Sequence, residues 1–299
     1  MSVSYKELKS ERQWRSSTGL KEEQFKILVS HFANAYEQFF GESLTERKGN
    51  SSQESIFKTY EELLFFVLFS LKSGLTYDVL GFVFGLDGSN ARAQPKIRSA
   101  GASPCFVEGR GDARPLVFRS QRFRGLVFRG RGADFGRHRA ALAAPQGQRS
   151  AKRSLQRQKK AHTVKALVIS NPQKLIRYVS RSYFGRAHDF GILKTEFPPR
   201  KTWFKRFKVR LDLGFVGFGD LYPCQQLYLP NKKPKKQELS DEQKAENKTQ
   251  ASERVAVEHS IGGLKRYRFL SDRLRAHDPK LYDLVLGVCA GLWNFNILN

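Results

Sequence analysis

The sequence is poor in cysteine and in acidic residues, and each shortage narrows the classes of function. Its 299 residues include 3 cysteines, whose spacing fits neither a disulfide framework nor a metal site. Only 28 acidic residues accompany 53 lysines and arginines, which gives a formal net charge of +25. Such an excess of positive charge favours a polyanion as partner. We therefore expect a nucleic-acid-binding protein in a reducing, cytoplasmic setting.

Long apolar runs are also scarce. The run at 63–71 is too short for a bilayer span, and the run at 281–298 carries Asp283, Asn294 and Asn296. The second run therefore predicts a buried or amphipathic closing helix. The start of the chain is rich in lysine, glutamate and serine and does not resemble a signal peptide. These features favour nucleic acid over a membrane as the binding partner of the basic chain.

The N-terminal third has the apolar spacing of helices. One helix is predicted to end near Gly41 and a second, more apolar one at Gly74. The residues that carry the first pattern are Phe25, Leu28, Val29, Phe32 and Tyr36; the second is carried by Leu63, Leu64, Val67, Leu68 and Leu71. The polar, serine-rich stretch at 42–55 is interpreted as a linker.

A compact pair of short helices follows at 76–92. Thr76 can cap the first helix, whose inward side is predicted to be Val79, Leu80 and Val83. A turn at 86–88 leads to a second helix capped by Ser89 and opening with Asn90 and Arg92. This is the form of a helix-turn-helix, in which the early residues of the second helix face base edges. An ordinary helical hairpin is the alternative.

Residues 93–160 differ abruptly in composition. They contain no Tyr, Trp, Asn, Thr or Met and have an excess of Arg, Ala and Gly. Three interpretations compete: a disordered Arg/Gly-rich RNA-binding segment, a solvated basic linker, and translation out of frame. Codon degeneracy permits the third, because a shifted frame across 132–140 can read ALILDATEQ, with the Asp codon shared by Gly136 and Arg137. In each case the composition predicts no stable core.

In the C-terminal part, apolar residues again recur with the spacing of strands and helices. A strand–turn–strand pair is expected at 162–183, a helix that begins near Asp189, and a strand that ends at Asp212. A helix at 251–270 would place Arg254, Glu258 and Gly262 on one face, with Lys265 continuing it. Val255, Ile261, Leu264 and Tyr267 supply its apolar spacing, and Ser240 with Gln243 forms a capping box upstream. The alternative is a solvated helix in which Glu258 only pairs with Arg254.

Several of these segments resemble DDE-superfamily transposases of the insertion-sequence and Harbinger-like branch. The pattern R-x-x-V-E-H-x-I-G-x-L-K around Glu258 resembles the third acidic signature, and LDLGF at Asp212 resembles the second. His188-Asp189 and GLWN at 291–294 match further family positions. The resemblance implies an α/β RNase H-like catalytic domain at 161–299, with its first strand lost or disrupted. It also favours an all-α helix-turn-helix domain at 1–92, before the out-of-frame and disordered segment at 93–160.

The resemblance further implies a divalent metal cofactor, Mg²⁺ or Mn²⁺, held by the catalytic residues Asp212 and Glu258. The family pattern includes a third carboxylate, which precedes the other two in the chain. No in-frame residue of this sequence matches it, because Asp134, which is close in position, has no strand before it. Since Mg²⁺ demands near-ideal geometry, we expect this copy to be catalytically inactive. The alternative for Asp212 is a strand-end carboxylate paired with Arg210 or Lys208, and His188 is interpreted as a structural hydrogen-bonding residue.

The implied partner is DNA, namely the element's terminal inverted repeats and the target, with a possible homo-oligomer. Expected contacts are the base readers Ser89, Asn90 and Arg92, and two groups of phosphate-binding residues. The first group is Lys232, Lys233, Lys235 and Lys236; the second is Lys265, Arg266 and Arg268. The alternative function is a non-catalytic basic nucleic-acid-binding protein in which the Arg/Gly-rich segment is genuine.

Overall fold

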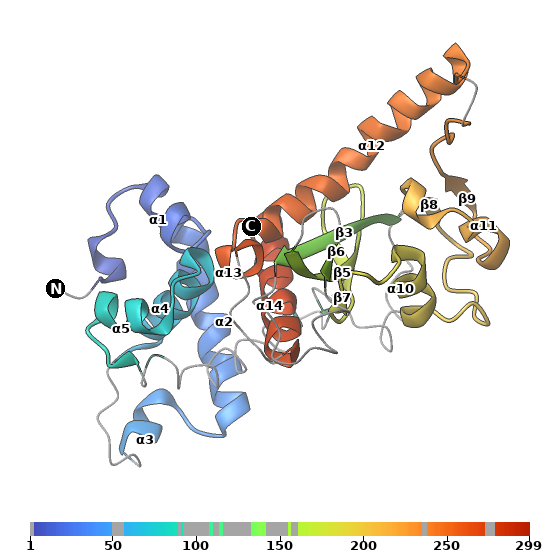
Figure 1. Ribbon diagram of the computed structural model, residues 1–299. Coiled ribbons are helices and arrows are strands. Elements are labelled where there is room, and N and C mark those ends of the chain that lie inside the picture. Colours follow the sequence, from blue (N-terminus) through green and yellow to red (C-terminus); the bar gives the residue numbers. More distant parts are fainter. Residues whose placement is uncertain are drawn as a thin grey trace. The chain divides into compact units, whose positions relative to one another are not determined.

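The computed structural model divides into two compact units, which are described separately (Figure 1). It describes residues 3–49, 57–88, 91, 133–141, 161–234, 238–272 and 279–299, and three short strands. The first unit comprises Met1–Pro115, Lys265–Leu274 and Lys280–Asn299, and the second comprises Leu116–Leu264 and Arg275–Pro279. By its contacts, the last helix therefore belongs with the N-terminal helices. The domain boundaries predicted from the sequence assigned it to the catalytic domain at 161–299.

The first unit is mainly helical, as expected. Helices α2 and α4 confirm the two predicted helices, and each ends at a left-handed glycine, Gly41 (φ 73°) or Gly74 (φ 62°). The elements are η1 (Tyr5–Glu7), α1 (Glu11–Ser17), α2 (Glu22–Phe40), α3 (Leu44–Gly49), α4 (Tyr60–Ser73), α5 (Tyr77–Phe84), β1 (Glu108–Gly109), β2 (Arg114–Pro115), α13 (Arg268–Ser271) and α14 (Pro279–Leu298).

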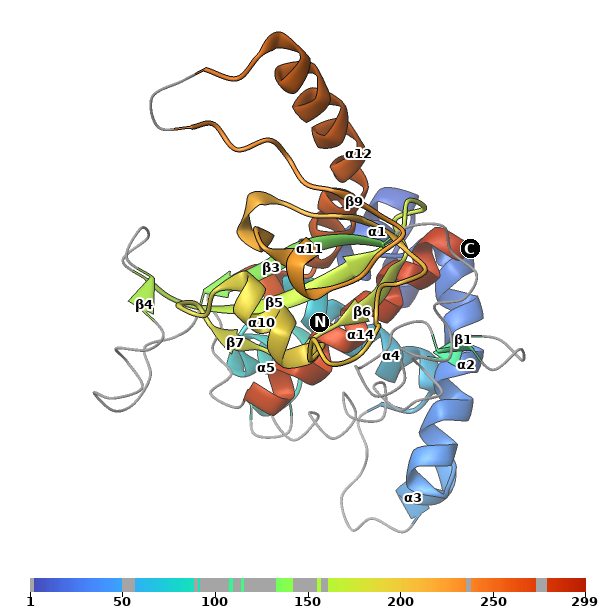
Figure 2. The ribbon, with the colours of Figure 1, turned by 90° about the vertical axis from the view of Figure 1, so that its right-hand side faces the viewer.

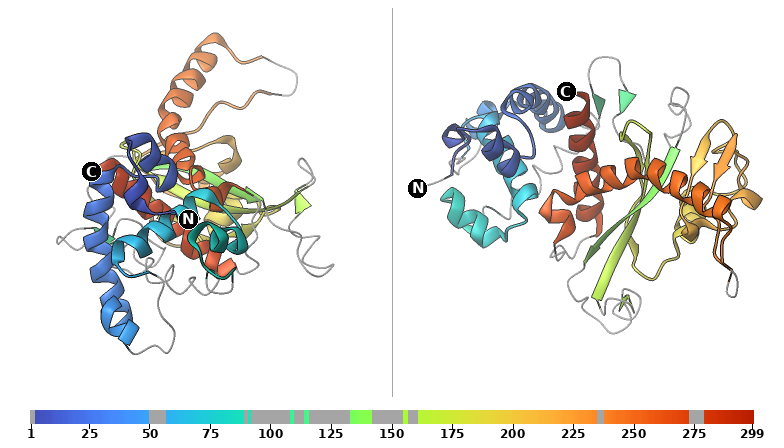
Figure 3. Two further views of the ribbon diagram at one scale, coloured as in Figure 1. Left: turned by 90° about the vertical axis from the view of Figure 1, so that its left-hand side faces the viewer. Right: turned by 90° about the horizontal axis from the view of Figure 1, so that it is seen from above.

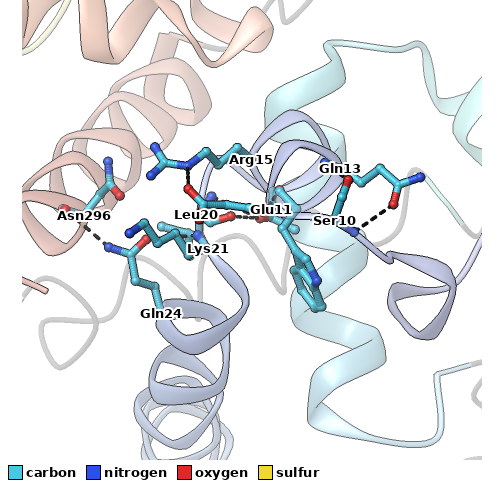
Figure 4. Close-up of polar contacts among 10 residues, drawn as sticks. Ser10, Glu11, Gln13, Arg15, Leu20, Lys21, Gln24 and Asn296 are labelled. Carbon is cyan, nitrogen blue, oxygen red and sulfur yellow. Dashed lines mark hydrogen bonds and ion pairs between the residues drawn. The ribbon is translucent and has the colours of Figure 1, made fainter.

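Side-chain caps begin the first helices (Figure 4). Ser10 and Gln13 form a capping box at α1, in which the Ser10 hydroxyl accepts from the Gln13 amide at 3.2 Å. At the start of α2, the Gln24 side-chain amide donates to the Asn296 carbonyl of α14 at 3.4 Å. The first contact satisfies a backbone N–H that the start of a helix otherwise leaves unpaired. The second occupies a carbonyl in the last turn of α14 and joins α2 to that helix.

Helix α5 is capped by Thr76 as predicted, but its buried side differs from the prediction. Leu80, Gly81 and Phe84 are buried, whereas Val79 is 43% exposed. The reason is the turn at 86–88, whose backbone packs on Gly81: a Cβ added there would lie 2.6 Å from the Leu86 carbonyl oxygen. Gly88 and Ala91 are helical, and the Ala91 amide donates to the Asp87 carbonyl at 2.9 Å. Ser89, Asn90 and Arg92 lie outside the described residues.

The closing-helix prediction is confirmed for α14. By length and composition, α14 is the one helix in the described part of the chain that could cross a membrane. However, 61% of its apolar stretch is buried within the protein, as in the core helices of globular domains. Its length and composition are therefore weak evidence for a span.

The second unit is built on a seven-stranded sheet with the order β4-β5-β3-β8-β9, in which β6 and β7 also pair with β5. Strand β3 is antiparallel to β5 and parallel to β8. Figure 2 shows β3 beside β5. The elements are β3 (Ala133–Ala141), β4 (Leu155–Gln156), β5 (Ala161–Ser170), β6 (Ile176–Val179), β7 (Tyr183–Phe184), α10 (Asp189–Glu196), β8 (Lys208–Arg210), η4 (Leu213–Phe215), α11 (Phe218–Leu221), β9 (Gln226–Tyr228) and α12 (Asp241–Lys265).

Strand β3 corrects the expectation that the first strand of the sheet is lost or disrupted, because this strand is formed and paired on both sides. Its backbone pairs with β5 from Asp134↔Ser170 to Ala141↔Thr163 and with β8 at Ala133↔Val209 and Asp134↔Arg210. Strand pairing uses backbone N–H and C=O groups, which every residue except proline supplies, and 133–141 contains no proline. A segment of unusual composition can therefore still occupy the central position between β5 and β8. Most of 93–160 otherwise lies outside the described residues.

The core of this unit lies between one face of the sheet and α10. It contains apolar residues of the strands and of the segment after β8, together with aromatic and aliphatic residues from α10 and the loops. The cluster includes Leu167, Ile169, Val209, Leu211, Phe190, Ile192, Leu193, Phe197, Phe204, Phe215 and Phe218. Each such side chain contributes about 1.5–3 kcal/mol when fully buried. This packing sets the position of β8 and of the residues that follow it.

Helix α12 is a single long helix (Figure 3), and its predicted capping box is present. The Gln243 amide donates to the Ser240 hydroxyl at 3.2 Å, and the Ser240 amide donates to Gln243 Oε1 at 3.1 Å. The prediction of one helix to residue 270 is wrong, because α12 ends at Lys265 and the extended Tyr267 caps α13. Val257, Ile261 and Leu264 are buried, whereas Val255 is 40% exposed.

Candidate functional site

Asp212 lies two residues after the end of β8 at Arg210, whereas the sequence predicted that the strand would end at Asp212 itself. The preceding residue is held by β9, because the Leu211 amide donates to the Tyr228 carbonyl at 3.0 Å. Asp212 is half-buried and caps η4, and its Oδ1 accepts from the Gly214 amide at 2.8 Å. Arg210, which the alternative interpretation paired with Asp212, forms an ion pair with Glu253 of α12 at 2.8 Å. Asp212 is thus a fixed carboxylate at the C-terminal end of β8.

A second carboxylate, Asp189, lies beside Asp212. A Cβ added to Gly214 would be 2.9 Å from Asp212 Oδ1 and 3.2 Å from Asp189 Oδ2, so both side chains approach the same glycine. Asp189 is buried and pairs with the buried Lys165 of β5 at 3.4 Å, and the Lys165 ammonium also donates to the Ala187 carbonyl at 2.8 Å.

Sequence reasoning identified Asp189 as a helix-start carboxylate and, together with His188, as a match to a family position, but not as a site residue. Its neighbour His188, matched in the same dipeptide, is the exposed N-cap residue of α10 and makes no capping hydrogen bond through its side chain. The dipeptide match was the signal that could have drawn Asp189 into the site. Nothing in the sequence indicated Lys165, because a lysine within a strand most often faces solvent.

Glu258 lies on α12 and is exposed. The same helix meets β8 through Glu253, and Glu258 follows Glu253 by five residues, which is about 7.5 Å along the axis. Among the described side chains no ion pair joins Glu258 to Arg254, whose Nε is buried without a hydrogen-bond partner. Gly262 has open space around it, since an added Cβ would meet nothing within 4 Å. Glu258 and Gly262 are therefore accessible, whereas Arg254 on the same face is half-buried.

The acidic residues do not fit the metal centre that the resemblance implies. In the described part of the chain, no group of three or more His, Cys, Asp or Glu side chains could hold a metal ion. Continuing the parallel register of β3 and β8 by two residues beyond Asp134↔Arg210 places position 136 level with Asp212. That position is a glycine, which offers no ligand. Two Mg²⁺ ions require several correctly placed oxygens, so we derive no metal-dependent step for this chain.

The basic residues expected to bind DNA fall into separate places. Lys232 and Lys233 are exposed on a loop tied to α12 by Asn231 and Asn247, whose side chain accepts from the Asn231 amide at 2.7 Å. Lys233 pairs with Glu238 at 3.3 Å, which offsets part of the loop's charge. Lys235 and Lys236 lie outside the described residues. The second group, Lys265, Arg266 and Arg268, is exposed at the end of α12 and the start of α13.

Comparison with known protein families agrees with the motif at Glu258. A family model described as DDE superfamily endonuclease matches residues 139–294, a little over half of the chain. The match begins within β3 and reaches into α14, so it includes both Asp212 and Glu258. No curated protein and no solved structure matches the chain.

Proposed function

This chain belongs to the DDE superfamily endonucleases, and from that membership we propose that it is an inactivated transposase. Its active relatives of the insertion-sequence or Harbinger-like branch would bind the terminal inverted repeats of an element and cut and join DNA. Divalent metal ions, Mg²⁺ or Mn²⁺, supply the chemistry in that reaction by activating a water and stabilising the leaving oxygen. The net charge of +25 supports a DNA partner.

The order of elements supports an RNase H-like catalytic domain. A central strand, β3, is followed by the β5–β6 hairpin, helix α10, the parallel strand β8 and the long helix α12. Asp212 follows β8 and Glu258 lies on α12, as the second and third acidic motifs require. We assign to these two residues the catalytic and metal-binding roles of the active relatives.

The pairing register between β3 and β8 is the observation that supports inactivation by a frameshift. Position 136 is level with Asp212 by continuation of the Asp134↔Arg210 pairing. The codons of Gly136 and Arg137 permit an aspartate in the shifted frame. A restored aspartate would thus stand beside Asp212 at the centre of the sheet, where a third carboxylate is needed. Losing one member of a catalytic group commonly costs several orders of magnitude in rate.

DNA binding is assigned to the helix-turn-helix and to exposed lysines and arginines. The capped helix α5 and the tight turn that follows it support this assignment, and Ser89, Asn90 and Arg92 would face base edges. The Lys232–Lys236 loop and the group Lys265, Arg266 and Arg268 would contact phosphates, which hold the protein on DNA without reading sequence.

Metal-dependent nicking of element-end DNA tests this proposal. The chain as written is compared with a chain whose 93–160 segment is re-read in the shifted frame. We expect the restored chain to nick with Mg²⁺ or Mn²⁺, and Asp212→Asn or Glu258→Gln in the restored chain to abolish nicking. The chain as written should show none.

Equal nicking by both chains would show that the frameshift account is wrong and that the 93–160 segment is functional. The alternative, a non-catalytic basic nucleic-acid-binding protein, would be favoured by a restored chain that neither nicks nor binds, beside a chain as written that binds single-stranded RNA tightly.

A further inference from the structure

Three cations from two distant segments of the sequence, Lys72 on one side and Arg266 and Arg268 on the other, lie close together in the first unit. The Lys72 ammonium, in the last turn of α4, donates to the Arg266 carbonyl at 3.1 Å and lies 5.8 Å from the centre of the Tyr267 ring. Arg268 begins α13 and packs against the end of the same helix, at Gly74. We call Lys72, Arg266 and Arg268 the cationic cluster.

The backbone that carries the cluster is held firmly. Gly74 has a left-handed φ of 62°, and a Cβ added there would lie 2.9 Å from the Arg268 Cβ and 3.0 Å from its carbonyl carbon. Tyr267 is buried and packs on Gly19, where an added Cβ would lie 3.1 Å from the tyrosine hydroxyl. The Arg266 guanidinium lies 5.7 Å from the centre of the Trp293 ring, within cation–π range. The charges therefore project from an ordered surface.

No carboxylate offsets these charges in the described part of the chain. The ion pairs there involve other lysines and arginines, and none includes Lys72, Arg266 or Arg268. Partial burial, and then the charges of Arg266 and Arg268, lower the pKa of the Lys72 ammonium. Three like charges with no ion-pair partner among the described side chains oppose folding, and a bound anion would reduce their repulsion.

We propose that the cationic cluster is a binding site for a phosphate group of the DNA backbone; this inference rests on the proposed function. Two guanidinium groups offer forked donors that match phosphate oxygens, and an ammonium adds a point charge. Lys72 is the new member, since it lies far from Arg266 in sequence and only folding brings it near. The cluster contacts no base edge by itself, so it positions DNA without reading its sequence.

The salt dependence of DNA binding tests the site in the full chain. Affinity for a short duplex of random sequence is measured between about 50 and 200 mM KCl for the parent, Lys72→Gln and Arg268→Gln. Each variant should reduce the slope of log K against log [salt] by about 0.9, the value for one lost phosphate contact. Lys9→Gln is the matched control, because Lys9 is an exposed lysine of the same unit and should leave the slope unchanged. Thermal unfolding of each variant checks that it folds.

The outcomes distinguish failure of the proposed phosphate site from failure of the proposed function. Slopes for Lys72→Gln and Arg268→Gln equal to that of Lys9→Gln, with DNA binding otherwise intact, would overturn the site and leave the proposed function standing. A parent chain that binds no DNA would instead overturn the proposed function. A reduced slope on RNA but not on DNA would contradict the DNA assignment. Stabilisation by inorganic phosphate that is lost in Lys72→Gln, without any effect on DNA binding, would identify a free-phosphate site.

Discussion

Gly214 lies where two carboxylates meet, and replacing it with alanine tests the arrangement around Asp212. Gly214 is not among the glycines with a positive φ, so alanine is compatible with its backbone. The obstacle is steric, because the new Cβ would lie 2.9 Å from Asp212 Oδ1 and 3.2 Å from Asp189 Oδ2. A contact below 3.0 Å forces the Asp212 side chain to move from the Gly214 amide that it now accepts from at 2.8 Å.

The expected loss follows from these contacts. Losing the cap that Asp212 provides for η4 costs about 1 kcal/mol. Displacing Asp189 from Lys165 adds to this, with an upper limit of about 3–5 kcal/mol for complete loss of a buried pair. The displacement needed at 3.2 Å is small, so we expect Gly214→Ala to lower the free energy of unfolding by about 1–2 kcal/mol.

Urea unfolding followed by tryptophan fluorescence provides the assay, with Gly262→Ala as the control. Gly262 is an exposed helical glycine with nothing within 4 Å of an added Cβ. Alanine there should raise the stability by about 1 kcal/mol, because glycine is a poor helix former. The two substitutions are chemically identical and should act in opposite directions. A Gly214→Ala variant as stable as the parent would refute the convergence of Asp189 and Asp212 on this glycine.

Further predictions concern two ion pairs and DNA specificity. Lys165→Met should cost about 3–5 kcal/mol, since it leaves the buried Asp189 without this partner, and the double variant with Asp189→Asn should cost less in urea unfolding. The Arg210 side chain lowers the pKa of Glu253, so this pair should stabilise the fold above the ordinary carboxyl pKa and lose its effect as the pH falls through the lowered value. Glu253→Gln should therefore flatten that part of the stability–pH curve. Filter binding should show affinity for a terminal repeat less than about a thousandfold above that for random DNA.

Local patterns in the sequence were sufficient to predict much of the fold. The helices that became α2 and α4, with Gly41 and Gly74 at their ends, and the Ser240–Gln243 capping box all depend on residues a few positions apart. The same holds for the β5–β6 hairpin and for the placement of Asp212 at the end of a strand. The acidic motif at Glu258 indicated the family, and the family match agrees with it.

Contacts between distant segments decided the rest. Strand β3 forms because the backbones of β5 and β8 offer it partners on both sides, whereas its side chains gave no strand signal. Val79 and Val255 are exposed although their helical spacing suggested burial, because the packing partners of a helix select which face is covered.

Long-range convergence also assembled both polar sites. Asp189 and Asp212 meet at Gly214, and Lys165 pairs with Asp189. Lys72 likewise joins Arg266 and Arg268 from a segment far away in the chain. The sequence alone determined which charged residues were present and, apart from Arg266 and Arg268 beyond the end of α12, on which elements they lie. Only tertiary structure decided which of them meet, because side-chain proximity follows from how helices and strands pack rather than from spacing along the chain.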